Sequence, residues 1–201
     1  MLFGVRLATP ADAAGVLAIY APIVRDTAIS FEIDPPSAWE MARRIDFTLE
    51  RLPYLVYEDG GEIGGYVYAG SHRERGAYLW SVDVTVYIHE RMRRSGVGRA
   101  LYTSLLALLR LQGYCRAYAG ITLPNAGSVG LHESFGFSAV GVYRAVGHKL
   151  GAWHDVGWWE LALRAPAKRP EEPASLLAAQ RLPEWQRALE SGQRLRGRRA
   201  A

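Results

Sequence analysis

The sequence predicts one α/β domain in which helices cover the faces of a mixed, mostly antiparallel sheet. Helical and strand-like segments alternate along most of the 201 residues. Hairpin signals interrupt this alternation, which argues against a doubly wound parallel sheet. The composition is that of a globular protein, with 49% hydrophobic and 22% charged residues. A chain of this length can bury one core but hardly two.

The first half of the sequence contains signals for three strands and two helices. Thr9 and Pro10 fit the N-cap and the first position of a helix. Ser37 and Glu40 fit a capping box before a second helix. Asp59-Gly60-Gly61 is typical of a hairpin turn between two β-rich runs. We therefore expect strands at 5–8, 54–58 and 63–69, and helices at about 10–25 and 38–51.

Strict alternation of apolar and polar residues predicts the next strand, from Trp80 to Ile88. Its polar face consists of Ser81, Asp83, Thr85 and Tyr87. A glycine-bearing loop follows, and then a helix over 98–112 that has leucines at core spacing and ends at Gly113. The remaining expected elements are a helix from about 125 to 135 and strands at 115–122, 137–142 and 155–163.

The net charge of +4 is confined to the end of the chain. Residues 165–201 contain 8 basic and 4 acidic side chains, whereas residues 1–164 are balanced. We therefore expect no nucleic acid partner, and interpret Arg194, Arg196, Arg198 and Arg199 as a solvated end. We divide the chain into a domain over 1–164 and a linker with a basic tail over 165–201. The tail is expected to be partly helical, with a break near Pro183, or disordered.

Several classes of protein do not fit this sequence. No apolar run approaches the roughly 18 residues of a membrane span, and the N-terminus does not resemble a signal peptide. We therefore expect no membrane association and a cytoplasmic location. Cys115 is the single cysteine. Because no CxxC or HExxH spacing occurs either, we expect no metal.

The strongest functional signal is the loop between the alternating strand and the helix that follows it. This loop has the sequence Arg93-Arg94-Ser95-Gly96-Val97-Gly98-Arg99. Glycines let successive backbone N–H groups turn inward, and the helix N-terminus adds partial positive charge, so the loop suits a pyrophosphate. It lacks the GKS/T ending of a nucleoside triphosphate loop and the third glycine of the Rossmann fingerprint. A purely structural role of its glycines stays open.

Six stretches of the sequence together indicate a family. In the loop, Arg93, Gly96 and Gly98 fit the pattern Arg/Gln-x-x-Gly-x-Gly/Ala. The other stretches are 77–88, 101–106, 123–125, 131–137 and 151–158. In these the chain resembles the GCN5-related N-acetyltransferase (GNAT) superfamily and, more narrowly, the phosphinothricin acetyltransferase family, over residues 5 to about 164. The resemblance implies a GNAT fold, with six to seven strands splayed at the cofactor site.

The resemblance also implies how acetyl-CoA, the co-substrate, binds. Its pantetheine arm would pair with the main chain of the strand that precedes the loop, and the loop would hold the pyrophosphate. Asn125 would bind the amide arm, and a helix N-cap is its structural alternative. The implied residues are Val86, Tyr87, Ile88, Arg94, Ser95, Gly96, Val97, Gly98, Arg99 and Asn125.

Two residues are implied in catalysis by the resemblance. Asp83 stands where the family usually has a glutamate as general base, so a bridging water completes the relay or the role has weakened. Its structural alternative is pairing with a nearby arginine. His132 would protonate the departing thiolate or help to deprotonate the amine. Its alternative is a half-buried histidine whose hydrogen bonds are satisfied within the protein.

Substrate residues are expected after the first helix and between strands. An amino-acid-like acceptor carries a carboxylate or phosphinate, for which arginine is a bidentate partner, although loop solvation is an alternative. Glu32 stands where the family often has arginine, which leaves the identity of the acceptor open. The expected substrate residues are Phe31, Glu32, Arg73, Arg75, Tyr78 and Thr122.

The function implied by the resemblance is direct acetyl transfer, in a ternary complex, from acetyl-CoA to the α-amine of a small acceptor. Phosphinothricin, methionine sulfoximine and methionine sulfone are acceptors of the implied type, and a homodimer is implied as well. Two alternatives stay open. The first is a protein or peptide N-acetyltransferase, which needs an open groove. The second is a CoA-binding module without catalysis, suggested by Asp83 in place of glutamate.

Overall fold

The structure is a computed structural model that describes residues 3–193. Its strands are β1 (Phe3–Leu7), β2 (Tyr54–Asp59), β3 (Glu62–Ser71), β4 (Ser81–Ile88), β5 (Arg116–Leu123), β6 (Ser138–Lys149) and β7 (Ala152–Ala162). Its α-helices are α1 (Ala13–Asp26), α2 (Ala38–Leu49), α3 (Val97–Gln112), α4 (Ala126–Glu133), α5 (Leu176–Ala179) and α6 (Trp185–Leu189). Short 3-10 helices are η1 (Pro10–Asp12), η2 (Gly76–Tyr78), η3 (Glu90–Met92) and η4 (Glu190–Gly192).

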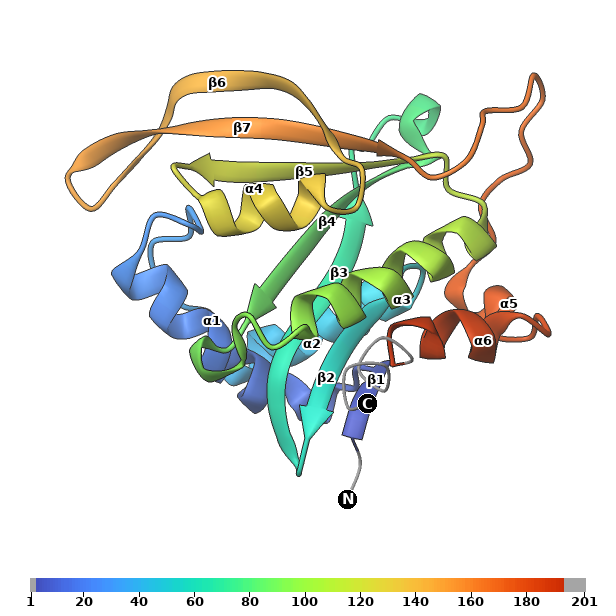
Figure 1. Ribbon diagram of the computed structural model, residues 1–201, viewed down its shortest axis with the longest axis horizontal. Helices are drawn as coiled ribbons and strands as arrows, with labels where there is room; N and C mark the ends of the chain where they lie inside the picture. The colour runs from blue at the N-terminus through green and yellow to red at the C-terminus, as the bar shows by residue number, and fades with distance from the viewer. Residues whose placement is uncertain (1–2, 194–201) are drawn as a thin grey trace.

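The strands form one seven-stranded sheet in the order β1-β2-β3-β4-β5-β7-β6. Every neighbouring pair is antiparallel except β4 and β5, which are parallel. Figure 1 shows helices on both faces of this sheet, so the predicted mixed α/β class is confirmed.

Local signals set the ends of several elements. Ser37 caps α2, because its Oγ accepts the backbone N–H of Glu40 at 3.1 Å. The helix predicted at Pro10 begins instead with the 3-10 turn η1, and α1 starts after it. Gly60 and Gly61 both have positive φ angles, as a two-residue hairpin turn requires.

Two hydrophobic clusters lie on opposite faces of the sheet. One lies beneath α3, and the leucines predicted for the core, Leu101, Leu105, Leu108 and Leu109, are all 0% exposed. The other packs α1 and α2 against Tyr54, Val56 and Tyr66. Because alternate residues of a strand point to opposite faces, Val82 and Val84 lie on the α3 face, whereas Asp83 lies on the other.

The parallel pair β4 and β5 separates after three rungs. Its pairs are Ser81 with Arg116, Val82 with Ala117, and Asp83 with Tyr118. Beyond Asp83 the two strands diverge, as Figure 1 shows, while β3 stays paired with β4 as far as Ile88. Within residues 3–193, the β5-facing edge of β4 therefore has no strand partner from Val84 to Ile88, and the expected splay is present.

The last hairpin is longer than the sequence predicts. β6 continues to Lys149, beyond the expected end at Val142, through an irregularity where Ala145 adopts a φ of 45°. It pairs only with β7 and forms an edge of the sheet. Most of β6 is exposed on both faces. The alternation of apolar and polar residues that marks a half-buried strand is therefore absent beyond Val142.

The segment after β7 packs against the domain. We call residues 175–193, which contain α5, α6 and η4, the C-terminal strap; Figure 1 shows α6 near α3. Ser104 Oγ on α3 donates to Leu189 O at 2.6 Å and accepts the N–H of Gly192 at 3.2 Å. A Cβ on Gly192 would lie 1.9 Å from Ala100 O, so the close contact needs glycine. Pro183, where a break in the helix was expected, lies between α5 and α6. Arg194, Arg196, Arg198 and Arg199 lie outside the described residues.

No helix within residues 3–193 is both long enough and apolar enough to cross a membrane. The cytoplasmic location stays a prediction.

Candidate functional site

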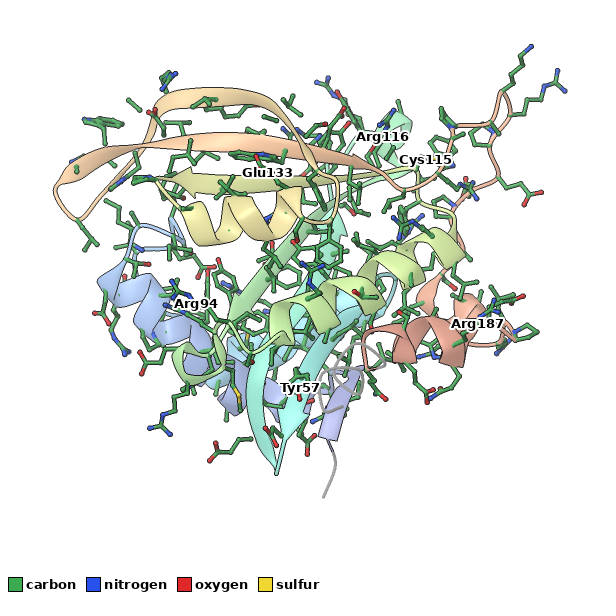
Figure 2. All side chains as sticks on the ribbon, viewed as in Figure 1. Tyr57, Arg94, Cys115, Arg116, Glu133 and Arg187 are labelled. Atoms are coloured by element: carbon green, nitrogen blue, oxygen red, sulfur yellow. The ribbon has the colours of Figure 1, made fainter. Side chains whose placement is uncertain are left out.

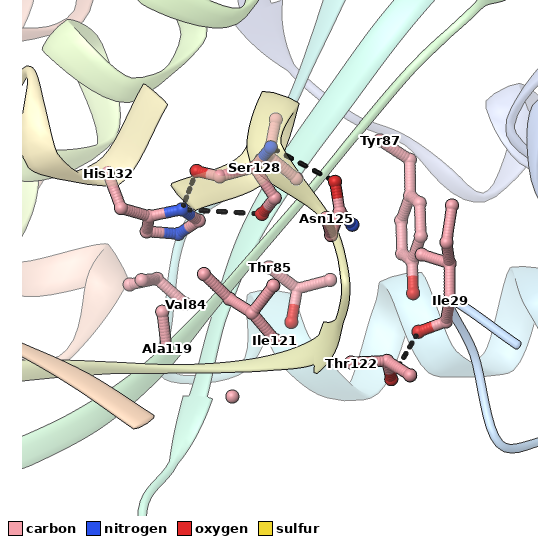
Figure 3. A pocket seen from close by; sticks show the side chains of 12 residues that line it. Ile29, Val84, Thr85, Tyr87, Ala119, Ile121, Thr122, Asn125, Ser128 and His132 are labelled. Atoms are coloured by element: carbon pink, nitrogen blue, oxygen red, sulfur yellow. Dashed lines mark hydrogen bonds between the residues drawn. The ribbon is translucent and has the colours of Figure 1, made fainter. Parts of the chain in front are cut away.

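A cavity of about 90 Å³ opens where β4 and β5 diverge (Figure 3). Its lining comes from both faces of the sheet, because it includes side chains of consecutive residues of β4. The volume corresponds to a few water molecules, so the cavity fits one end of a ligand. The lining residues are Ile29, Val84, Thr85, Val86, Tyr87, Ala119, Gly120, Ile121, Thr122, Asn125, Ser128 and His132.

His132 borders the cavity from α4 and is 3% exposed. Its Nε2 lies 2.7 Å from Tyr102 Oη, and its Nδ1 lies 2.7 Å from the carbonyl oxygen of Ser128. Since a carbonyl only accepts, Nδ1 carries the proton and Nε2 accepts from the tyrosine. Burial lowers the pKa of His132. The side chain is thus satisfied as in the structural alternative, but buried and not half-buried, and its catalytic role stays a prediction.

Asn125 combines the two roles considered for it. Its Oδ1 accepts the backbone N–H of Ser128 at 3.1 Å and caps α4. The same side chain lines the cavity, as Figure 3 shows. The cap uses the amide oxygen, so the amide hydrogens are left for other partners.

The glycine-bearing loop lies just before α3, and Figure 2 shows Arg94 there. Arg94 and Gly96 have φ angles of 59° and 89°, so left-handed residues flank Ser95. Ser95 Oγ donates to Met92 O at 2.6 Å. Gly96 is the N-cap of α3 and offers the first turn no side-chain acceptor. The N–H groups there suit an anion, as the sequence predicts.

Gly98 and Arg99 connect the loop to its surroundings. A Cβ on Gly98 would lie 3.3 Å from Leu131 and 3.7 Å from Ile88, so glycine lets the start of α3 approach both. Arg99 Nη2 donates to Ser134 Oγ at 3.3 Å. Ile88 therefore packs beneath the loop and is not part of the cavity lining.

Asp83 forms the last rung of β4 with β5, on the face opposite α3 and α4. Its Oδ1 lies 2.6 Å from Nδ1 of His72, so its hydrogen-bond partner is a histidine and not the arginine considered as the structural alternative. The ring of His72 stacks on Tyr118, with 4.3 Å between centroids. Burial raises the pKa of Asp83. Sequence reasoning missed His72, and the available signal was its position soon after the second strand of the predicted hairpin.

The loop between β3 and β4 borders this pair of residues. Tyr78 presents its ring edge-on to His72, with 5.8 Å between centroids. The guanidinium of Arg73 lies 5.8 Å from the centroid of a Trp158 ring, and Arg75 is exposed at the start of η2. The structure thus brings Arg73 and Tyr78 to the Asp83 side of the sheet.

Trp158 carries a signal that sequence reasoning missed. Its Nε1 is buried and has no hydrogen-bond partner within residues 3–193. Its indole lies over Gly120, where a Cβ would be 3.3 Å from the ring. Buried donors in native proteins are normally paired, so this N–H suits an oxygen of a ligand.

The three other predicted substrate residues have different surroundings. Thr122 lines the cavity, and its Oγ1 donates to Ile29 O at 3.4 Å (Figure 3). Phe31 packs so closely on β6 that a Cβ on Gly147 would lie 2.2 Å from its ring. Glu32 is not in the cavity lining.

Glu32 is instead held in an ion pair. Its Oε1 accepts from Arg44 at 2.7 Å and from Tyr20 Oη at 3.0 Å. It borders a second cavity of about 210 Å³ between α1, α2 and the sheet. The charge that differs from the family pattern is therefore compensated within the protein.

Lys149 was also missed by sequence reasoning. It is 6% exposed, and its Nζ donates to the carbonyl oxygens of Val24 and Ser30, each at 2.6 Å. These bonds connect the end of β6 to the end of α1 and to the segment that carries Phe31. Lys149 thus fixes a border of the site without touching the cavity.

Within residues 3–193, no group of three or more histidine, cysteine, aspartate or glutamate side chains could hold a metal ion.

Comparisons with known proteins agree with this geometry. The sequence model of the acetyltransferase (GNAT) domain matches residues 5–158. Phosphinothricin N-acetyltransferase of Streptomyces viridochromogenes is 40% identical over 172 residues, which cover 85% of this chain and 94% of that protein. The L-methionine sulfoximine/L-methionine sulfone acetyltransferase of Salmonella typhimurium is 34% identical, with 79% and 94% covered. The crystal structure of a phosphinothricin acetyltransferase from Sinorhizobium meliloti in complex with AcCoA has a TM-score of 0.79 and 30% identity, with 88% and 99% covered.

Proposed function

The chain belongs to the acetyltransferase (GNAT) family, and on that premise we propose that it transfers acetyl from acetyl-CoA to the α-amine of a small, amino-acid-like acceptor. The observation that carries this proposal is the cavity between β4 and β5, bordered by the free edge of β4 and by α4. Relatives named for phosphinothricin and for methionine sulfoximine and sulfone support a small acceptor.

Acetyl-CoA fits the face of the sheet that α3 and α4 cover. The unpaired edge from Val84 to Ile88 offers main-chain groups to the amides of its pantetheine arm, as strand addition does. The backbone N–H groups from Ser95 to Arg99 would hold the pyrophosphate, with the positive charges of Arg94 and Arg99 beside them. The amide hydrogens of Asn125 would complete the binding of the arm.

The acceptor amine fits the opposite face, where Asp83 lies. Attack on a thioester needs a neutral amine, so a group at the site must take a proton from the ammonium. The Asp83 carboxylate, paired with His72, stands at the rung where the cavity begins. Transfer in a ternary complex then needs no covalent intermediate on the protein.

A carboxylate or phosphinate on the acceptor has suitable partners on the same face. Arg73 supplies a guanidinium, and Trp158 supplies a buried N–H without a protein partner within residues 3–193. Charge-assisted hydrogen bonds from arginine to such groups are short and strong. An acceptor that lacks the anionic group should therefore bind less tightly.

The test is to follow release of free thiol from acetyl-CoA with amino acid analogues and with short peptides as acceptors. We expect saturable turnover with analogues that carry an α-amine and an anionic group. Saturable turnover with peptides alone would select a protein or peptide acetyltransferase. CoA binding without thiol release across the panel would select the non-catalytic module.

A homodimer is the second part of the proposal, and β6 supports it as an exposed edge strand. Its neighbourhood carries large apolar side chains that are 39% to 67% exposed, namely Val140, Val142, Tyr143, Val146, Leu150 and Trp153. A second copy of the chain would cover them. We expect a dimer by light scattering and a monomer for Trp153→Lys. The matched control is Leu177→Lys, at an apolar residue of the strap that is 61% exposed, and this variant should stay dimeric. A parent protein that is monomeric in solution would contradict the homodimer.

A further inference from the structure

We propose that His72, oriented by Asp83, is the group that accepts the proton of the acceptor's ammonium. This role presupposes the acetyl transfer proposed above and assigns its proton transfer to a pair of residues. The pair stands at the rung Asp83–Tyr118, the last at which β4 and β5 are joined. The cavity lining begins at the next residues, Val84 and Ala119, so the imidazole, which is not itself part of the lining, lies next to the closed end of the opening.

The surroundings of His72 fix the orientation of its ring. The ring stacks on Tyr118 with an interplanar angle of 19°, and it meets Trp158 edge-on with 6.2 Å between centroids. Because the Asp83 carboxylate accepts a hydrogen bond from Nδ1, the proton of the neutral ring is on Nδ1. The lone pair is then on Nε2, the nitrogen that can act as a base.

Nε2 of His72 is left open by the protein. No hydrogen bond joins it to any partner within residues 3–193, although the side chain is only 13% exposed. A nearly buried imidazole with one nitrogen held by a carboxylate and the other open is the arrangement that general-base catalysis requires. The Asp83 carboxylate stabilises the imidazolium that forms.

Asp83 alone is poorly placed to accept the proton. One of its oxygen atoms is already engaged at 2.6 Å by His72, and its side chain is short. The imidazole adds reach beyond the carboxylate. Besides Asp83, the titratable and charged groups facing His72 are Tyr78 of η2, Tyr118 of β5 and the adjacent Arg73. Glu160, by its charge and a side-chain hydrogen bond, and Arg116, by its charge, act on Tyr118.

The chemical step balances as follows. Nε2 of His72 takes one proton from the ammonium, and the freed nitrogen lone pair forms a bond to the acetyl carbonyl carbon. The bond between that carbon and sulfur breaks, and the second nitrogen proton goes to the thiolate. The imidazolium then releases its proton to solvent. Ammonium and thioester thus become amide, thiol and one proton.

The experiment compares the parent with His72→Asn and His72→Ala in the thiol-release assay. Asparagine keeps a donor near the place of Nδ1 but lacks the base Nε2, so kcat/KM should fall about 100-fold. The affinity for CoA, measured by calorimetry, should not change. The acidic limb of the pH profile should flatten, because the variant lacks the base that must be neutral to accept the proton.

His72→Ala separates a chemical from a structural role. Added imidazole should restore turnover at least about tenfold, in proportion to the concentration of its neutral form, since only this form accepts a proton. The role of His72 would be overturned if His72→Asn kept the turnover and pH profile of the parent. It would also be overturned if imidazole did not rescue a folded His72→Ala. Neither outcome would contradict the proposed acetyl transfer. A parent that releases no thiol with any acceptor would overturn the proposed acetyl transfer and this role with it.

Discussion

The two faces of the sheet at the opening between β4 and β5 each present a histidine. The two histidines differ in how many of their ring nitrogens are hydrogen-bonded within the protein. On the α4 face, His132 has both ring nitrogens engaged by Tyr102 and Ser128. On the other face, His72 has one nitrogen on Asp83 and the other open. A histidine in a recognisable motif can thus be part of the packing, while another one has the free nitrogen that proton transfer needs.

The same contrast extends to the groups around each histidine. Near His132 the side chains are aromatic and close-packed, with Tyr102, Phe135 and Phe137 in contact. Near His72 lie Arg73 and the unpaired N–H of Trp158. If the faces divide the work, substitutions on the first should alter cofactor affinity or stability, and substitutions on the second should alter turnover.

The largest effect is expected from a negative charge in the glycine-bearing loop. Gly96→Asp should weaken CoA binding more than about 100-fold, because the carboxylate occupies the positive end of α3 and repels the pyrophosphate. Gly96→Asn is the matched control, since asparagine also tolerates the left-handed backbone at φ 89°. Calorimetry that finds equal affinities for both variants would remove the loop from the binding site.

The second effect is expected at Asp83. Asp83→Asn should lower kcat at least about tenfold, since the amide no longer stabilises an imidazolium at His72. The affinity for CoA should stay near that of the parent, which calorimetry can measure beside the turnover assay. Unaltered turnover would exclude Asp83 from the proton transfer. A parallel loss of cofactor affinity would contradict the division between the faces.

A smaller effect is expected at Lys149, which touches neither face of the cavity. Lys149→Met keeps an unbranched side chain but loses both bonds to the carbonyl oxygens of Val24 and Ser30. The segment that carries Phe31 should loosen, so KM for the acceptor should rise about fivefold with kcat nearly unchanged. Steady-state kinetics with varied acceptor test this, and a change in kcat alone would contradict it.

The smallest effect on turnover is expected at His132, where stability should respond instead. His132→Phe should change kcat less than about twofold. The free energy of unfolding should fall by about 1 to 3 kcal/mol, because Tyr102 and the Ser128 carbonyl lose their partner. Urea unfolding measures the latter. A folded variant of parent-like stability with turnover reduced more than about tenfold would support the catalytic role predicted for His132.

The pH dependence of stability gives a further test of His132. Burial lowers its pKa in the folded state from the ordinary 6.5. Its contribution to stability is therefore present above that value and is lost as the pH falls from there toward the folded pKa, because the unfolded chain binds the proton more readily. His132→Phe should show a shallower decline over this range, and an unchanged slope would contradict a buried, neutral histidine.

The elements that the sequence predicts well are those with a regular pattern. Alternation from Trp80 to Ile88 identified β4 and its polar face, and leucine spacing identified α3. By contrast, the cavity residues that were predicted came from the family resemblance, namely Val86, Tyr87, Thr122, Asn125 and His132, and the other lining residues were not predicted as site residues. The C-terminal strap was expected only as a tail that is partly helical or disordered. Its apolar residues Leu176, Ala179 and Trp185 join the core cluster beneath α3, and Ser104 and Gly192 add hydrogen bonds, so its packing depends on a distant helix.

The residues that sequence reasoning missed are defined by contacts between distant segments. His72 meets Asp83 because of the register between β3 and β4. Lys149 reaches Val24 across 125 positions. The buried N–H of Trp158 can be recognised only when its surroundings are known. Pattern and composition carry no information on such distant partners, which explains why Asp83 was predicted as a site residue and its partner His72 was not.

The opening in the sheet also bears on the kinetic order of the reaction. If acetyl-CoA and the acceptor occupy opposite faces of the sheet, as proposed, neither stands in the path of the other. We then expect neither reactant to have to bind first and neither product to have to leave first. Double-reciprocal plots for the two reactants should therefore intersect. Product-inhibition patterns should show no compulsory order of binding or release.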